Sequence, residues 1–395
     1  MTATTTTPTE TFTWDRLTLA VTVGYCLLVA GLSTGVVLGE LRNQFHLSGV
    51  VAALHGSTFG VALLVVGIWG VSIVDRLGRG NALRLSGAAL VAGVLLFGVG
   101  PLWQLTLTGT ALSGFGGAMF VMVVPGVISD HHGDHRAAAF AAVNGVPGAI
   151  GVAFSLAIGA ALGLRWSWRG PYLVLTAVIA ACLFLVARPV SLPTSARHGR
   201  FSLAHFRRRE VLVPWLFIVN AVLTEFTVGI WAATYLKEAG GASSGLAPAL
   251  AGAFGITMFL SRMVLPTTLR RLRGATISVS FLTIGAGAIV MCFGPGLTLK
   301  VLGLVIVGFG GGPLYPLTVD RLYERAGSTV DSVSLGAIGA MASGAAVTVG
   351  PLALGVLADS VGLRRAILIV PALALLGAVT QRPRRGELAV PSLLG

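Results

Sequence analysis

The chain has 395 residues, of which 55% are hydrophobic and only 10% are charged, whereas ordinary soluble domains carry about 25% charged residues. This composition excludes a soluble globular protein, and 54 Gly and 17 Pro without a collagen period exclude a fibrous one. The 27 Lys and Arg outnumber the 14 Asp and Glu, giving a net charge of +13, so charge placement must decide between a membrane protein and a nucleic-acid binder.

Twelve apolar stretches run along the chain, most of them close to the length of about 20 residues that a helix needs to cross a bilayer. The first follows a Thr-rich polar terminus with no cleavage site, which predicts a retained helix rather than a signal peptide. The last is short and contains Pro371, but flanking arginine side chains can extend outward. The predicted spans are 17–39, 49–73, 82–100, 103–128, 137–163, 171–187, 211–234, 246–268, 275–294, 298–319, 332–358 and 366–381.

The basic residues divide unequally between the two sides of the predicted membrane. With the N-terminus in the cytoplasm, nineteen Lys and Arg lie in inside segments and seven, including Lys300, in outside segments, which leaves only Arg262 within a span. This bias follows the positive-inside rule, so both termini are expected to be cytoplasmic in a multi-pass protein of the cytoplasmic membrane. The surplus charge is therefore an orientation signal, and we expect no nucleic-acid partner.

The two halves of the chain resemble each other. The sequence GFGG at 114–117 in the fourth span recurs at 308–311 in the tenth, and the basic turn after the second span is echoed at 271–274 after the eighth. Parallel repeats of this kind build several transporter folds. We therefore predict an all-α membrane protein of two pseudo-symmetric six-helix bundles, with a cytoplasmic tail at 1–16, bundles at 17–188 and 211–381, a linker at 189–210 and a second cytoplasmic tail at 382–395.

The turn after the second span reads DRLGRG at 75–80. It resembles the loop motif G-x-x-x-D-R-x-G-R-[RK] of the major facilitator superfamily, which lies between that family's second and third helices. Twelve spans, a basic central linker, the repeat and Trp168-Arg169 before the sixth span agree with this resemblance. Val71 stands at the motif's leading Gly position, and Gly80 replaces its last basic residue.

In that family the loop latches the cytoplasmic ends of the two halves in the outward-open state. The resemblance implies that Asp75 faces a helix N-terminus of the other half, while Arg76 and Arg79 pair with acids across the seam and Gly78 forms the turn. The alternative is that these charges only mark the cytoplasmic boundary. Two other motifs are altered, because Thr110 replaces the family's fourth-helix Arg and the fifth helix lacks the drug/proton antiporter pattern.

Three ionisable residues inside predicted spans stand out, and each is a functional-site hypothesis because burying it is costly. Glu225 lies near the middle of the seventh span, where a carboxyl can carry a proton, bind a cationic group or pair with Arg262. Arg262 lies in the cytoplasmic third of the eighth span, where anion porters of the family carry a substrate-contacting Arg. His55, in the second span, is predicted to be either a gate or proton relay or a packing residue.

The sequence offers further, weaker candidates for the site. One face of the seventh span carries Asn220, Thr224, Thr227 and Trp231, and Glu225 points roughly 130° away from it at 100° per residue. If that stripe faces the central cavity, Glu225 faces a neighbouring helix. Asn144 in the fifth span is another candidate, and the helices that line the family's cavity would offer Tyr25, Ser33, Thr34, Thr110, Met119, Asn220, Thr224, Trp231 and Tyr315.

Metal and enzyme chemistry are not indicated. The segment DHHGDH at 130–135 holds metal-capable side chains but is expected to be a solvated loop, and the three cysteines lie in apolar runs. Within the predicted spans the sequence carries no Walker motif and no paired carboxylates. We therefore expect no cofactor and no metal, and a protein that is not an enzyme.

The leading hypothesis is a secondary active transporter that moves a small organic solute by alternating access, with proton coupling through Glu225 as a second hypothesis. The alternatives are a small-anion carrier of carboxylate or nitrate-like substrates that uses Arg262, or an exporter of drugs or metabolites. A non-transporting membrane sensor or membrane enzyme is the alternative from another class. The expected partners are a small-molecule substrate, protons and the lipid bilayer, and the expected state is a monomer.

Overall fold

The computed structural model describes residues 14–132, 135–186, 203–268, 275–327, 329–330 and 332–381. All regular structure in these ranges is helical, and a short 3₁₀ helix, Leu203–Arg207, precedes the second half. The α-helices are α1 (Arg16–Leu32), α2 (Thr34–Phe45), α3 (Gly49–Leu77), α4 (Arg79–Val99), α5 (Trp103–His132), α6 (Arg136–Gly163), α7 (Arg169–Val186), α8 (Arg209–Glu238), α9 (Leu246–Thr268), α10 (Thr276–Phe293), α11 (Gly296–Gly311), α12 (Leu314–Ala326), α13 (Ser332–Val361), α14 (Leu363–Ala366) and α15 (Ile369–Thr380).

The twelve predicted spans correspond to these helices. Among the described residues, eleven helices or helix pairs are long and apolar enough to cross a membrane, and the slightly shorter apolar part of α9, Leu246–Arg262, is the twelfth. The first span is α1 and α2 with a break at Ser33, and the tenth is α11 and α12 with a break at Gly312 and Pro313. Of the predicted linker, residues 189–202 lie outside the described residues, and the domain boundaries stay predictions.

Each half has its own apolar core. In the first half, Phe97, Trp168 and Tyr172 pack against one another in edge-to-face and tilted arrangements, with centroid separations of 5.3 to 5.8 Å. In the second half, Trp231 and Phe281 belong to a core formed mainly by α8, α10, α11 and α15. In a bilayer such packing, rather than water exclusion, holds helices together.

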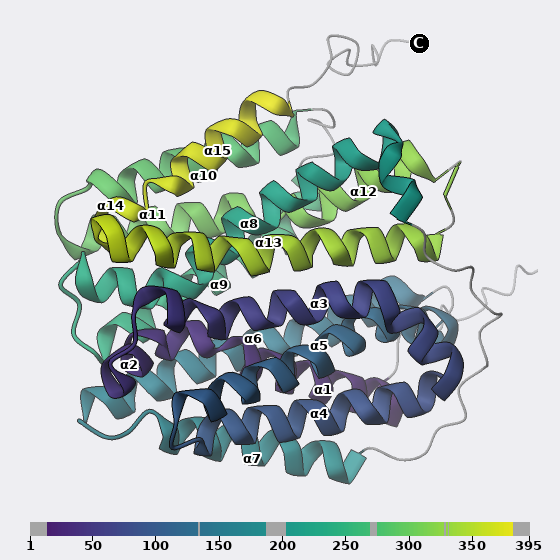
Figure 1. Ribbon diagram of the computed structural model, residues 1–395, viewed down its shortest axis with the longest axis horizontal. Helices are drawn as coiled ribbons and strands as arrows, with labels where there is room; N and C mark the ends of the chain where they lie inside the picture. Colours follow the sequence, from purple (N-terminus) through teal and green to yellow (C-terminus); the bar gives the residue numbers. More distant parts are fainter. Residues whose placement is uncertain are drawn as a thin grey trace, which may run out of the picture.

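Three helix pairs make most of the contacts between the two halves: α3 with α13, α2 with α8, and α6 with α9. The helices α3 and α13 lie side by side through the middle of the molecule (Figure 1). Gly60 of α3 makes this approach possible, because a side chain there would meet the backbone of Gly344 and Thr348 on α13. The close packing of α3 on α13 therefore requires a residue without a side chain at position 60.

Lys300 is predicted to lie in an outside segment, but in the structure it belongs to α11. It lies in the first turns of α11, only 7% exposed, and its Nζ donates to the Met291 carbonyl at 3.2 Å. In a regular helix the N–H of the residue four positions later would bond this carbonyl, but that residue is Pro295, which has no N–H. The carbonyl therefore needs a donor from another part of the protein. The Tyr235 hydroxyl donates to the same carbonyl at 2.9 Å.

We predict that Gly60→Leu destabilises the protein by about 1–3 kcal/mol, because the added side chain overpacks the α3–α13 seam. Unfolding of the purified protein in detergent would measure this loss. Gly255→Leu on α9 is the matched control, since an added Cβ there meets nothing within 4 Å. Equal stability of the two variants would show that the seam is looser than described.

Candidate functional site

An ion pair between α8 and α9 forms the centre of the candidate site. Arg262 Nη2 lies 3.5 Å from Glu225 Oε1, and Arg262 Nε donates to the Gly312 carbonyl at 2.8 Å. Pro316 explains the second contact, because it cannot supply the N–H that a regular helix would offer to Gly312. The Glu225 side chain is 14% exposed and that of Arg262 is 39% exposed, so the pair is not sealed inside the protein.

Two tyrosines from different halves lie near this pair. Tyr315, in α12 just beyond the helix break, shares a hydrogen bond with the Ser343 hydroxyl of α13 and interacts electrostatically with both members of the ion pair. Tyr25 of α1 is close enough to Tyr315 for an electrostatic interaction. Electrostatic interactions thus link four of the predicted residues, Glu225, Arg262, Tyr25 and Tyr315, and we call them the central cluster.

The polar stripe on α8 faces away from this cluster, which corrects the expectation that it lines a central cavity. Asn220 Nδ2 donates to the Leu373 carbonyl of α15 at 3.3 Å, and Trp231 Nε1 donates to the Pro351 carbonyl of α13 at 3.1 Å. Thr224 donates to the Asn220 carbonyl at 2.8 Å. The stripe thus packs within the second half, and Glu225 on the other side of α8 reaches the cluster.

His55 lies inside the first half. Its ring is 1% exposed, Nε2 is 2.9 Å from the Thr106 hydroxyl and Nδ1 is 3.3 Å from the Ala52 carbonyl. This geometry favours the packing alternative over a gate. Asn144 lies on the exposed side of α6, and its neighbour Gly145 faces Phe259 of α9 across the seam.

The latch residues lie at the junction of α3 and α4, at what we call the Asp75 end of the molecule. Gly78 adopts a φ of 76°, which favours glycine, and begins α4 directly after α3. Arg79 Nη1 lies 2.5 Å from Asp130 Oδ2 of the same half. The expected pairing of Arg79 across the seam is therefore wrong for this conformation.

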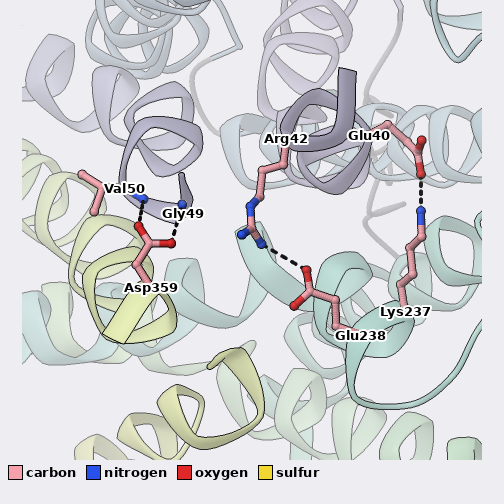
Figure 2. Close-up of polar contacts among 7 residues, drawn as sticks. All are labelled: Glu40, Arg42, Gly49, Val50, Lys237, Glu238 and Asp359. Carbon is pink, nitrogen blue, oxygen red and sulfur yellow. Dashed lines mark hydrogen bonds and ion pairs between the residues drawn. The ribbon is translucent and has the colours of Figure 1, made fainter. Parts of the chain in front are cut away.

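The opposite end of the molecule holds contacts that sequence reasoning missed. Asp359, near the end of α13, accepts hydrogen bonds from the first two amides of α3, with 2.7 Å from Gly49 N to Oδ1 and 2.9 Å from Val50 N to Oδ2 (Figure 2). The first amides of a helix have no partner within it and carry partial positive charge, so a carboxylate suits them. A side chain of the second half thus caps a helix of the first.

Two ion pairs between α2 and α8 strengthen this end, which we call the Asp359 end. Arg42 Nη1 lies 3.0 Å from Glu238 Oε1, and Lys237 Nζ lies 2.6 Å from Glu40 Oε1 (Figure 2). All four side chains are partly exposed, so each pair alone stabilises by at most about 1 kcal/mol. Together with the Asp359 cap they tie the halves at one end.

A spacing in the sequence could have indicated Asp359. The pattern Asp-x-x-Gly at Asp75 and Gly78 recurs at Asp359 and Gly362. Gly362 has a φ of 82° and starts the next helix, as Gly78 does with its φ of 76°. The two ends of the molecule therefore carry the same turn, and among the described residues it is the turn at the Asp359 end whose carboxylate bonds the other half.

One group in the described part of the chain could hold a metal ion. The ligand atoms of Asp15, His131 and His132 lie within 4.8 Å of one another. Both histidines belong to the last turn of α5, which corrects their assignment to a loop. Hydrogen bonds account for the group without an ion, because His131 bonds Asp15 and His132 Nε2 is 2.8 Å from the Thr18 hydroxyl.

Comparisons with known proteins agree with this architecture. Residues 19–333 match the family model described as Major Facilitator Superfamily. A protein of Sinorhizobium fredii (strain NBRC 101917 / NGR234) named uncharacterized transporter y4wD is 26% identical over 373 residues, which cover 88% of this chain and 94% of that protein.

Two solved structures share the fold. A mutant of the nucleoside transporter NupG has a TM-score of 0.76 at 12% identity, covering 92% of this chain and 98% of its own. A bacterial homolog of the human lysosomal transporter Spinster, inward-facing and occupied, has a TM-score of 0.70 at 15% identity, covering 95% and 98%.

We predict that Glu225 and Arg262 are energetically coupled. Glu225→Gln and Arg262→Gln, made singly and together, should give a coupling free energy of about 1 kcal/mol in a double-mutant cycle, because the pair is only partly exposed. Unfolding in mixed micelles measures each variant. The control cycle combines Glu225→Gln with Arg325→Gln at the exposed end of α12, and additive effects in both cycles would refute the coupling.

Proposed function

Since the chain belongs to the Major Facilitator Superfamily, we propose that it is a secondary active transporter that moves a small organic solute across the cytoplasmic membrane by alternating access. Transport itself follows from the family and from the relatives. The observation that carries the finer proposal is the central cluster, in which the ion pair interacts electrostatically with Tyr315, and Tyr315 with Tyr25 of the first half. Binding sites of such transporters lie at the interface between repeats.

Alternating access is supported by the unequal ends of the molecule. At the Asp359 end, a helix cap and two ion pairs join the halves, whereas at the Asp75 end Arg79 pairs within its own half. The positive-inside bias supports a cytoplasmic location for the Asp75 end and both termini. This conformation is then closed to the outside, and the inward-facing state is the one we assign to it.

The substrate class follows from the chemistry of the cluster. Glu225 and Arg262 neutralise each other, and the tyrosines offer hydroxyl groups beside aromatic faces, so a small neutral or zwitterionic solute with hydrogen-bonding groups suits them. A nucleoside has these properties, and the structural neighbour NupG is named a nucleoside transporter. The protein acts as a monomer and without a cofactor in this proposal.

A small anion is the second candidate substrate. The observation in its favour is that the Arg262 side chain is 39% exposed and its contact with Glu225, at 3.5 Å, is long for a charge-assisted hydrogen bond. A carboxylate could then displace Glu225 from the guanidinium. Absence of competition by small carboxylates or nitrate would exclude this candidate.

Proton coupling is assigned to Glu225 because it is the ionisable acid of the cluster. Release of Arg262 to a substrate would leave a carboxylate without its partner, which favours protonation. Substrate binding and proton uptake would therefore be linked through the same ion pair.

We predict that a thermal-shift screen with nucleosides, other metabolites, drug-like compounds and small anions identifies a ligand, which proteoliposomes then accumulate under an imposed pH gradient. Glu225→Gln should abolish pH-driven accumulation but keep exchange of labelled for unlabelled substrate, because exchange needs no net proton movement. Glu210→Gln, at the exposed start of α8, is the matched control. Unchanged pH-driven accumulation in Glu225→Gln would show that coupling does not depend on this residue.

A further inference from the structure

An apolar groove of about 740 Å³ lies on the first half, between α4 and α7 with α1 as its third wall. Its walls include Val21 of α1, Leu83, Val91 and Leu95 of α4, and Leu183 and Phe184 of α7. The volume lies within the range of roughly 300–1,000 Å³ that small-molecule pockets occupy. The groove is separate from the central cluster, none of whose residues line it.

The groove opens on a surface that faces the hydrocarbon of the membrane. The helices α4 and α7 lie at the edge of the first half that is farthest from α13 and the rest of the second half (Figure 1). Phe184 is 85% exposed and Leu185 is 75% exposed, although both are strongly apolar. In a bilayer these side chains contact lipid, so the molecules with ready access to the groove are lipids.

Two arginines give the groove a charged end. Arg16 of α1 and Arg84 of α4 are both among its lining residues and both are exposed. Arg84 Nη1 donates to the neutral Asn81 side chain at 3.0 Å, and Asp15 beside Arg16 is paired with His131. In the described ranges of the chain, neither guanidinium forms an ion pair.

The combination of an apolar groove and a basic end matches one class of molecule. We propose that the groove binds an anionic phospholipid, with an acyl chain along α4 and α7 and the headgroup phosphate on Arg16 and Arg84. The arginines lie at the Asp75 end, since Arg16 begins α1 and Arg84 follows the α3–α4 turn. With the orientation proposed above, that end faces the cytoplasmic leaflet, where basic pockets between helices bind anionic headgroups.

The test compares two lipids that differ only in headgroup. Native mass spectrometry of the full chain in detergent, titrated with dioleoyl-phosphatidylglycerol or dioleoyl-phosphatidylcholine, measures each affinity. The wild type should favour phosphatidylglycerol, and Arg16→Gln with Arg84→Gln should weaken it by about five-fold per arginine while leaving phosphatidylcholine unchanged. Arg209→Gln, at the start of α8 and outside the groove, is the matched control for charge.

A second variant tests the apolar part. Gly87 lines the groove, and a Cβ there meets only Leu183 Cδ2 at an ordinary 3.7 Å, so Gly87→Leu should fold and fill the space. It should reduce binding of both lipids, whereas Gly170→Leu, where an added Cβ meets nothing within 4 Å, should not. Equal affinity of the wild type for the two lipids, no lipid binding at all, or retention of phosphatidylglycerol by both groove variants would overturn the proposal.

Discussion

Inside a bilayer no water is available to a backbone group released at a helix end or break, so another part of the protein must bond it. This constraint explains why several polar side chains bond backbone carbonyls at helix ends and breaks. Arg262 bonds the Gly312 carbonyl opposite Pro316, and Tyr235 with Lys300 bonds the Met291 carbonyl opposite Pro295. Arg169 bonds the Gly98 and Gly100 carbonyls at the end of α4. At Gly312 and Met291 the side-chain donors therefore replace an N–H that a proline lacks.

The same constraint distinguishes hydrogen bonds that persist when the two halves move from hydrogen bonds that break. A carbonyl bonded within its own half, as at Met291, can keep its partner through a movement of the two halves. The first amides of α3 are bonded by Asp359 of the other half, and at the helix end they can exchange that partner for water when the halves separate. In our proposal the cap at the Asp359 end and the turn at the Asp75 end are therefore alternatives, one closed while the other is open.

Much of the fold could be predicted from the sequence, because twelve apolar stretches separated by charged turns leave few other arrangements. The orientation of side chains could not be predicted equally well. Helical periodicity places the α8 stripe and Glu225 on different faces, but it does not say which face meets which neighbour. The stripe meets α13 and α15, and Glu225 meets Arg262. The partners of Asp359 are backbone amides, so the sequence indicates this residue only through the Asp-x-x-Gly spacing that it shares with Asp75.

The central claim is that Asp359 holds the two halves together at one end of the molecule. Spin labels on Gln44 and Ser243 report the Asp359 end, and labels on Leu77 and Glu324 report the Asp75 end, since all four positions are exposed. Pulsed electron paramagnetic resonance on Asp359→Asn should show longer distances for the first pair and shorter ones for the second, with Asp320→Asn as the control. Distance distributions that Asp359→Asn leaves unchanged at both ends would contradict the claim.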